Sequence, residues 1–343
     1  MPITIGDVAK QAGVSRATVS RVLAGHPHIS PEVRARVKAA AQQLNYHPSR
    51  VARSLRAQKT RIIGLIISDI QNPFYPGLVR ALEDLAYANG YTVFLCNSDE
   101  SIDKEVLYLQ TMRAERVSGV VITPTRETDN PSRCLLEANI PVVAVDRKMA
   151  DLDVDTVVID NVSAACELAE HLIRNGHHRI GAVFGPATIT TSRERHEGYR
   201  RALGLHGIQE AESLVRVGVP KEPFGYESAK DLLSLPEPPT ALLLANNLLA
   251  LGAMRAIHEL GLRIPEDVCL ATFDNEAWTA FAQPPLTVID QPTYELGRRA
   301  GELLFRRIAD SSSTDVTPAH TLVTLQAQLI IRGSSVRPAS QPS

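Results

Sequence analysis

The chain has 343 residues, of which 44% are hydrophobic, and its formal net charge is -2 at pH 7. This length exceeds what one small core needs, so we expect two or three domains. No apolar run approaches the roughly 18 residues of a membrane span and no apolar core follows the first residues, which argues against a membrane segment and a secretory signal peptide.

The charge is unevenly distributed along the chain. Residues 1–61 hold 11 Lys and Arg against only two acidic residues, Asp7 and Glu32, whereas residues 62–343 hold 25 basic and 36 acidic residues. A basic head on an acidic body predicts that the head alone meets a polyanion.

The segment Thr4–Leu23 predicts two short helices joined by a tight turn. Thr4 is placed to cap a helix over residues 5–12, Gly13 supplies the bend, and Ser15 is placed to cap a helix over residues 16–23. On the second helix the apolar residues share one face, and the opposite face carries Arg16, Ala17, Ser20 and Arg21. Such a face suits the major groove of DNA, and a surface hairpin with solvated charges is the alternative.

Ser30-Pro31-Glu32 predicts the start of a third helix, which would close a three-helix headpiece over residues 1–48. In the following segment, 49–60, Val51 and Leu55 share a helical face among several basic residues. Two interpretations stay open for this segment. It is either a flexible basic linker, or a hinge helix that folds only on DNA with Leu55 as a wedge in the minor groove.

From residue 61 onward, apolar β-rich runs alternate with helical stretches. We expect strands at 62–67, 91–96, 118–122, 141–145, 156–159, 179–184, 214–217, 240–244 and 267–272, with helices between them. This alternation predicts an α/β body of two doubly wound lobes with parallel sheets covered on both faces. We place the body at 61–335, the N-lobe at about 61–160 and 291–320, and the C-lobe at about 161–290 and 321–333.

Several polar residues directly follow the predicted strands, where ligands bind in doubly wound sheets. They are Asn72 in the segment 69–74, Asp146, Arg147, Thr191, Arg193, Arg195, Asn246, Asn247, Asp274 and Gln291. Carboxylates, amides and guanidinium groups suit a polyhydroxylated ligand, although each residue alone is also explained as a loop polar or a helix cap. For Asn247 the two interpretations are equally good.

We find no phosphate-binding glycine loop and no nucleophile elbow, so we expect neither an enzyme nor a cofactor. His177 and His178 follow Gly176 and fit a helix C-terminus better than a metal site, so we expect no metal. The four cysteines, Cys96, Cys134, Cys166 and Cys269, are far apart and indicate reduced core residues of a cytosolic protein.

The chain closely resembles the LacI/GalR family of bacterial transcription regulators from Thr4 to about Gly333. The motifs that carry the resemblance include TIGDVAKQAGVSRATVSRVLAG, SPEVRARV, LNYHPSRVARSL, NPFY, VSGVVI, IPVVAVDR, GHHRIG, GLRIPEDV and PPLTVIDQP. The resemblance implies a repressor that binds a near-palindromic operator as a homodimer, with a body similar to periplasmic sugar-binding proteins. It implies control by a small-molecule effector, a sugar or sugar derivative, in the cleft between the lobes.

The resemblance also implies the site residues. Those expected to contact DNA are Thr4, Ser15, Arg16, Ala17, Thr18, Ser20, Arg21, His28, Arg50, Val51, Arg53 and Leu55. Those expected around the effector are Asn72, Phe74, Asp146, Arg147, Thr191, Arg193, Arg195, Asn246, Asp274, Trp278 and Gln291, with Phe74 and Trp278 as stacking residues.

Two positions depart from the family pattern. Asn246-Asn247 stands where the family commonly has Asn-Asp, and Ala17 is small where some members place a long polar side chain. Because three arginines lie near the expected cleft, an acid sugar or a phosphosugar is as credible an effector as a neutral sugar. A solute-binding protein and an enzyme on a doubly wound fold are the rival functions. We expect a cytoplasmic bacterial protein without membrane contact, associated with the nucleoid when bound to DNA.

Overall fold

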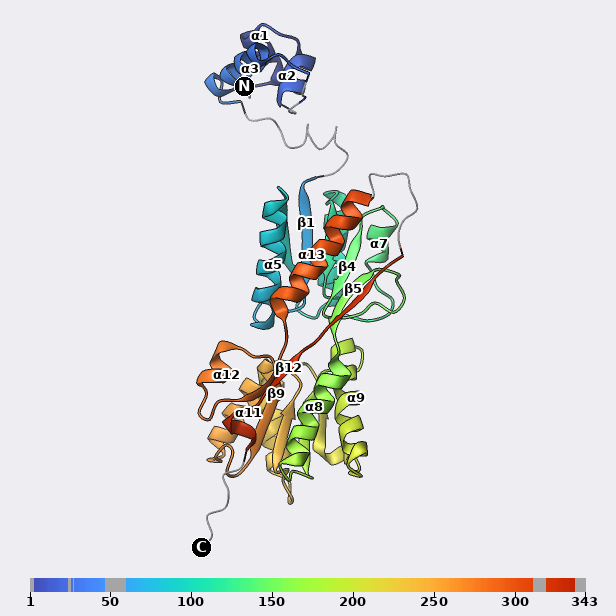
Figure 1. Ribbon diagram of the computed structural model, residues 1–343, viewed down its shortest axis with the longest axis vertical. Coiled ribbons are helices and arrows are strands. Elements are labelled where there is room, and N and C mark those ends of the chain that lie inside the picture. The colour runs from blue at the N-terminus through green and yellow to red at the C-terminus, as the bar shows by residue number, and fades with distance from the viewer. Residues whose placement is uncertain (1–2, 24–25, 27, 47–59, 311–318, 337–343) are drawn as a thin grey trace. The chain divides into compact units, whose positions relative to one another are not determined.

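The computed structural model describes residues 3–23, 26, 28–46, 60–310 and 319–336 (Figure 1). The chain divides into two compact units, Met1–Thr60 and Arg61–Ser343, each of which is described by itself. Residues 49–59 of the expected hinge segment, including Arg50, Val51, Arg53 and Leu55, lie outside the described residues.

The first unit contains the three predicted helices: α1 (Ile5–Ala12), α2 (Arg16–Leu23) and α3 (Pro31–Gln43). The backbone N–H of Thr18 donates to Ser15 Oγ at 3.1 Å and that of Val33 donates to Ser30 Oγ at 3.4 Å, so both serines cap their helices as expected. Gly13 ends α1 in the left-handed conformation, with φ of 63°. One small apolar cluster, with Val8, Val19 and Val37 fully buried, holds the three helices together.

The second unit contains two six-stranded sheets. The first has the strand order β11-β5-β4-β3-β1-β2, and all its neighbouring strands are parallel. We call this sheet and its helices the first lobe. Its elements are β1 (Ile62–Ile67), α5 (Phe74–Ala88), β2 (Thr92–Asn97), α6 (Ile102–Ala114), β3 (Gly119–Ile122), α7 (Arg133–Leu136), β4 (Val142–Val145), β5 (Asp155–Ile159), α13 (Thr293–Asp310) and β11 (Leu322–Leu325).

The second lobe contains a sheet in the order β12-β10-β9-β8-β6-β7, parallel except for the antiparallel pair β10–β12. Its elements are α8 (Asn161–Arg174), β6 (Ile180–Phe184), α9 (Thr190–Leu205), β7 (Val215–Val217), α10 (Glu222–Leu233), β8 (Ala241–Leu244), α11 (Asn247–Glu259), β9 (Cys269–Phe273), α12 (Ala277–Phe281), β10 (Thr287–Asp290), β12 (Gln328–Ile330) and the 3-10 turns Glu212–Leu214 and Gly333–Ser335.

The inner strands of both sheets are buried on both faces, as their continuous apolar runs predicted, whereas the edge strands β2, β7, β11 and β12 are partly exposed. In β1, Leu65 and Ile67 pack into the cluster that contains α5, whereas Ile66 faces the opposite cluster with Leu109 and Met112 of α6. Because alternate residues of a strand point to opposite faces, only an apolar residue at every position can fill both layers.

The chain passes between the two sheets three times: after β5, after β10 and after β11. In Figure 1 the red C-terminal ribbon runs from beside β5 to β12. The sequence assigned residues 321–333 to the second lobe, and for β11 this was wrong, since Leu322–Leu325 pairs with Thr156–Ile159 in the first sheet. Two short strands only two residues apart gave no indication that they belong to different sheets.

Candidate functional site

The outward face of α2 is basic and accessible. Arg16, Ala17 and Arg21 are exposed and Thr18 and Ser20 are half-buried, whereas Val19 and Val22 point into the small core. Thr4 precedes α1, and its backbone N–H and its Oγ1 donate to Asp7 at 2.8 and 2.7 Å. His28 is exposed in the loop before α3. The unit therefore presents one short helix whose two arginines can reach an anionic partner.

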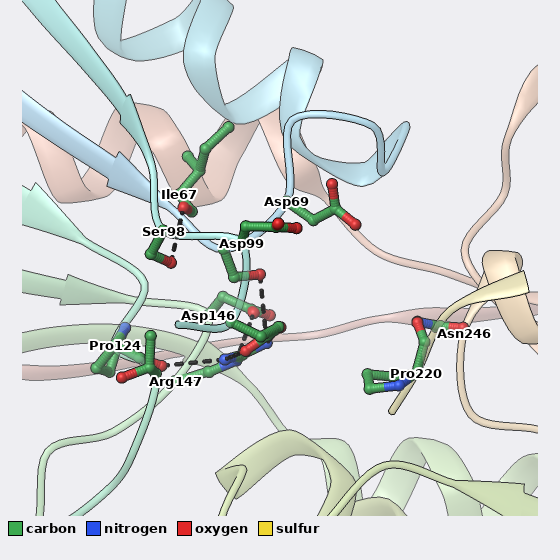
Figure 2. Close-up of polar contacts among 12 residues, drawn as sticks. Ile67, Asp69, Ser98, Asp99, Pro124, Asp146, Arg147, Pro220 and Asn246 are labelled. Atoms are coloured by element: carbon green, nitrogen blue, oxygen red, sulfur yellow. Dashed lines mark hydrogen bonds and ion pairs between the residues drawn. The ribbon is translucent and has the colours of Figure 1, made fainter. Parts of the chain in front are cut away.

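A polar cleft lies between the two lobes of the second unit, at the carboxyl ends of their strands. Its lining joins residues that are far apart in the sequence: Ser68, Asp69, Asn72, Phe74, Tyr75, Glu100, Asp146, Arg147, Ile189, Thr191, Ser192, Arg195, Pro220, Lys221, Ala245, Asn246, Leu248, Asp274 and Gln291. Figure 2 shows Asp69, Asp99, Asp146 and Arg147 of the first lobe in one part of the view, and Pro220 and Asn246 of the second lobe to their right.

Arg147 forms the main ion pair of the first-lobe wall. Its two terminal nitrogens donate to the Glu100 carboxylate at 2.8 and 2.6 Å, and they also reach the Pro124 carbonyl at 3.1 Å and Ser68 Oγ at 3.3 Å. Burial opposes both charges, but the pairing outweighs it and holds the pKa of Glu100 below its usual range. The charge of Arg147 is thus largely neutralised within the wall.

Asp146 follows β4 in the left-handed conformation, with φ of 69°, and is 8% exposed. Burial raises the pKa of Asp146 to about 6, with Asp274 and Glu100 adding to the shift and Arg147 and Arg195 opposing it. Its carboxylate is therefore poorly compensated and is suited to accept hydrogen bonds from a ligand that enters the cleft.

Asp274 follows β9 in the same left-handed conformation, with φ of 76°. Its Oδ1 accepts from Gln291 Nε2 at 2.5 Å, and its Oδ2 accepts from the backbone N–H and the Nδ2 of Asn247 at 3.1 and 2.8 Å. The Nδ2 of Asn247 also donates to Asn72 Oδ1 in the first lobe at 2.8 Å. These amides fix the Asp274 carboxylate from both sides.

Arg195 on α9 is 6% exposed and is held by neutral groups. Its Nε donates to Asn161 Oδ1 at 2.8 Å, its Nη1 donates to the Ala245 carbonyl at 2.6 Å, and its guanidinium carbon lies 4.0 Å from the centroid of the Phe273 ring. Burial lowers the pKa of Arg195, while the charges of Asp274 and Asp146 oppose that shift. The guanidinium is therefore a rigid donor that is stabilised by the charges of two carboxylates of the cleft.

Most of the residues expected around the effector line this cleft: Asn72, Phe74, Asp146, Arg147, Thr191, Arg195, Asn246, Asp274 and Gln291. Asn246 also caps α11, since its Oδ1 accepts from the Leu249 N–H at 2.8 Å. The capping function that the sequence left open for Asn247 thus belongs to its neighbour.

Two expected residues lie outside the cleft lining. Arg193 has a 44% exposed side chain and pairs with Glu127 of the first lobe. Thr191, Arg193 and Arg195 all lie on α9, and because residues four apart share a helical face, Thr191 and Arg195 point to the same side while Arg193 points away. Trp278 lies on the short helix α12, which was not predicted, and is half-buried against the core.

Sequence reasoning missed two charged cleft residues, Glu100 and Lys221. Lys221 Nζ lies 2.6 Å from Asp99 Oδ1 and 3.7 Å from Asp69 Oδ2, so it bridges the lobes. Both residues come soon after strands, β2 and β7 respectively. The rule that found the other cleft residues would have found these two if it had been applied to every strand.

Among the described residues, no group of three His, Cys, Asp or Glu side chains is arranged to hold a metal ion. No helix within the described ranges is both long and apolar enough to cross a membrane.

Comparisons with known proteins agree with this arrangement. Residues 4–49 match the family model of bacterial regulatory proteins of the lacI family. Residues 60–330 match the model of periplasmic binding proteins and the sugar binding domain of the LacI family. The repressor PurR of Mannheimia succiniciproducens is 35% identical, over 96% of this chain and 98% of its own. The ribose operon repressor of Halalkalibacterium halodurans is 38% identical, over 89% and 90%.

Solved structures agree as well. The lac repressor dimer bound to operator and the anti-inducer ONPF has a TM-score of 0.84 at 29% identity, covering 98% of this chain and all of that chain. The complex of the regulator CelR with cellobiose has a TM-score of 0.73 at 31% identity, covering 97% and 99%. A helix-turn-helix headpiece with a two-lobed binding body defines a transcriptional repressor with a sugar-binding domain, and not an enzyme. The chain belongs to the LacI family.

Proposed function

We propose that this repressor binds a near-palindromic operator as a homodimer and that a neutral, polyhydroxylated effector in the interlobe cleft controls it. The exposed face of α2 supports the first half of this proposal. Arg16 and Arg21 are the long donors on that face, and Ser15 and Thr18 lie at its start, where side chains contact phosphates. The residues expected to form the hinge, Arg50, Val51, Arg53 and Leu55, remain a prediction.

Site selection from random DNA tests the contact of Arg16 with a base. Arg16→Ala should weaken binding to the selected operator by about 1–3 kcal/mol and relax the preference at one base pair of each half-site. An unchanged selected motif would show that Arg16 does not read a base.

Exposed apolar residues of both lobes support the homodimer. In the first lobe they include Tyr87, Phe94 and Leu95, of which the last two lie on the edge strand β2. In the second lobe they include Val217 on the edge strand β7 and Leu251 on α11. A second copy would cover both sets together, and Phe94→Lys should shift the sedimentation coefficient from dimer to monomer.

The charges of the cleft are the reason for proposing a neutral effector. Its lining holds four carboxylates, Asp69, Glu100, Asp146 and Asp274, against three cations. Arg147 is paired with Glu100, and Lys221 with Asp99 and Asp69. Arg195 is influenced by the charges of both Asp146 and Asp274, so an anionic ligand would meet more negative than positive charge. The acid sugar and phosphosugar that the sequence left open are therefore disfavoured.

Hydroxyl groups fit the cleft because each donates and accepts. Asp146 can accept from them, and so can Gln291 Oε1, a buried oxygen that has no hydrogen-bond partner in the described structure. Arg195 supplies a donor. A thermal-shift screen of neutral sugars, sugar acids, sugar phosphates and purines tests the class, since a ligand that binds only the folded state raises the melting temperature. A larger shift with sugar acids or phosphates would contradict the proposed neutral class.

A further inference from the structure

One buried amide, that of Asn247, contacts both lobes at once. Asn247 is the first residue of α11 in the second lobe and is 1% exposed. Its Nδ2 donates to Asp274 Oδ2 in its own lobe and to Asn72 Oδ1 in the first lobe, each at 2.8 Å. The contact with Asn72 lies immediately before α5, beside the cleft residue Phe74.

The direction of the bond between Asn247 and Asn72 is fixed by its surroundings. Asn72 Oδ1 also accepts from the Phe74 backbone N–H at 3.0 Å, so the oxygen and not the nitrogen of that amide faces Asn247. The ionised Asp274 carboxylate can accept hydrogen bonds but cannot donate them. Both neighbours therefore require a donor at this position, and a carboxylate there, as is common in the family, would have none.

We infer that Asn247 is a positioning residue that latches the two lobes and orients Asp274 toward the cleft. Its link to effector binding rests on the proposed function, but the latch itself requires no effector. The Oδ1 of Asn247 has no hydrogen-bond partner within the described residues, so this amide serves the site through its donors.

The other contacts across the cleft are of a different kind. They are the ion pairs Lys148–Glu194 and Lys221–Asp99, each at 2.6 Å, and the pair Arg193–Glu127, and the three cationic side chains are 35–44% exposed. Exposed ion pairs contribute little and are screened by salt, with a Debye length of about 3 Å at 1 M. The bond between Asn247 and Asn72 joins two neutral amides and is buried at its Asn247 end, so in 1 M salt it is the contact that should still hold the lobes together.

The donor–acceptor polarity gives a sharp test, because the same substitution at the two ends has opposite effects. Asn247→Asp removes the donor and places a second carboxylate beside Asp274. Asn72→Asp keeps an oxygen that accepts from both Phe74 and Asn247. The full-length protein is measured by hydrogen–deuterium exchange in 1 M NaCl without any sugar. We expect Asn247→Asp to speed exchange severalfold in residues 69–75 of the first lobe, and Asn72→Asp to exchange there like the wild type.

Two further measurements separate the latch from a local defect. Exchange across α8 reports whether the fold is intact, and Asn139→Asp, on an exposed residue of the first lobe, controls for the added charge. In Asn247→Asp, lowering the pH should return exchange in residues 69–75 toward that of the wild type at the same pH, since a protonated carboxyl regains a donor.

Faster exchange confined to residues 246–250, with residues 69–75 unchanged, would overturn the latch, and so would equal effects of the two Asn→Asp variants. Both results are obtained without effector. A failure of the sugar screen would therefore contradict the proposed effector class and leave the latch to be decided by its own test.

Discussion

Two carboxylates of the cleft differ in their hydrogen-bond partners. Asp146 and Asp274 occupy equivalent places in the two lobes, each directly after a strand in the left-handed conformation. Asp274 accepts three hydrogen bonds, whereas Asp146 makes a 3.8 Å contact with Arg147 Nε. Because the buried Asp146 carboxylate has few partners, it should reduce the stability of the empty protein. A ligand that donates hydrogen bonds to it should therefore be favoured.

We predict that Asp146→Asn stabilises the empty protein and weakens effector binding. The folded pKa of Asp146, about 6, lies above its unfolded value near 3.9, so between these values the folded state binds more protons. The contribution of this group to the free energy of unfolding therefore falls as the pH rises through that window, and the loss persists at pH 7. The variant should gain on the order of 1–3 kcal/mol at pH 7 and nothing below about pH 4 in urea titrations. Equal urea midpoints at pH 7 would contradict this.

His171 on α8 is a buried histidine that contacts the C-terminal part of the described chain. Its Nε2 lies 2.8 Å from Ser335 Oγ, which in turn lies 2.5 Å from Thr287 Oγ1 of β10, so it holds the end of the described chain. Burial, with a smaller effect of Arg174, lowers the pKa of His171. As the pH falls below about 6.5 the unfolded chain takes up a proton that the folded one resists, and stability is lost.

His171→Gln should remove this pH dependence, because glutamine does not titrate. From pH 7.5 to pH 5.5 we expect the urea midpoint of the wild type to fall by more than the midpoint of the variant. His258→Gln, on an exposed position of α11, is the matched control and should follow the wild type. A constant difference for His171→Gln would show that His171 does not carry the effect.

At the scale of elements, two helices of the second lobe touch backbone to backbone. A Cβ at Gly225 of α10 would lie 2.3 Å from the Leu249 carbonyl oxygen of α11, and one at Gly252 of α11 would lie 2.1 Å from the Glu222 carbonyl oxygen of α10. The close approach positions the start of α11, where Asn246 and Asn247 reach the cleft.

Gly252→Ala should therefore force the helices apart and destabilise the protein by about 1–3 kcal/mol. Gly204→Ala is the opposite case, because a Cβ at that exposed position of α9 meets nothing within 4 Å. It should stabilise by about 0.4–1 kcal/mol through the unfolded chain. Thermal unfolding of both variants decides the matter, and a neutral Gly252→Ala would mean that α10 and α11 can separate at little cost.

At the scale of the whole molecule, the functional proposal is a coupling between two binding sites. An effector that favours one arrangement of the lobes must change operator affinity by the same factor by which the operator changes effector affinity. The direction of the change, induction or corepression, follows from which arrangement binds DNA.

We predict that Arg195→Ala abolishes this coupling because it removes a buried cationic donor from the cleft lining. Operator titrations with and without the sugar found in the screen should differ for the wild type and coincide for the variant. Titration calorimetry should show the loss of sugar binding directly. Wild-type affinity for the sugar in Arg195→Ala would rule out this cleft as the effector site.

The sequence by itself determined the elements whose signals are local. Ser15 and Ser30 mark helix starts because a cap acts within three residues, and residues 62–67 mark a central strand because each side chain must be apolar. The polar residues that directly follow strands marked most of the cleft, because the carboxyl ends of parallel strands meet at one edge of a sheet. The sequence did not predict which sheet residues 322–325 join, because no nearby residue encodes the edge with which a short strand pairs.

Only the tertiary structure decided which of these side chains act together. Arg193 lies outside the cleft because it is on α9 two residues from both Thr191 and Arg195, so its side chain leaves the helix on another face. Glu100 entered it as the partner of Arg147, 47 positions along the chain. Asn247 became a contact between lobes through Asn72, 175 positions away. Such pairs depend on distances through space, and the sequence specifies these distances only through the completed fold.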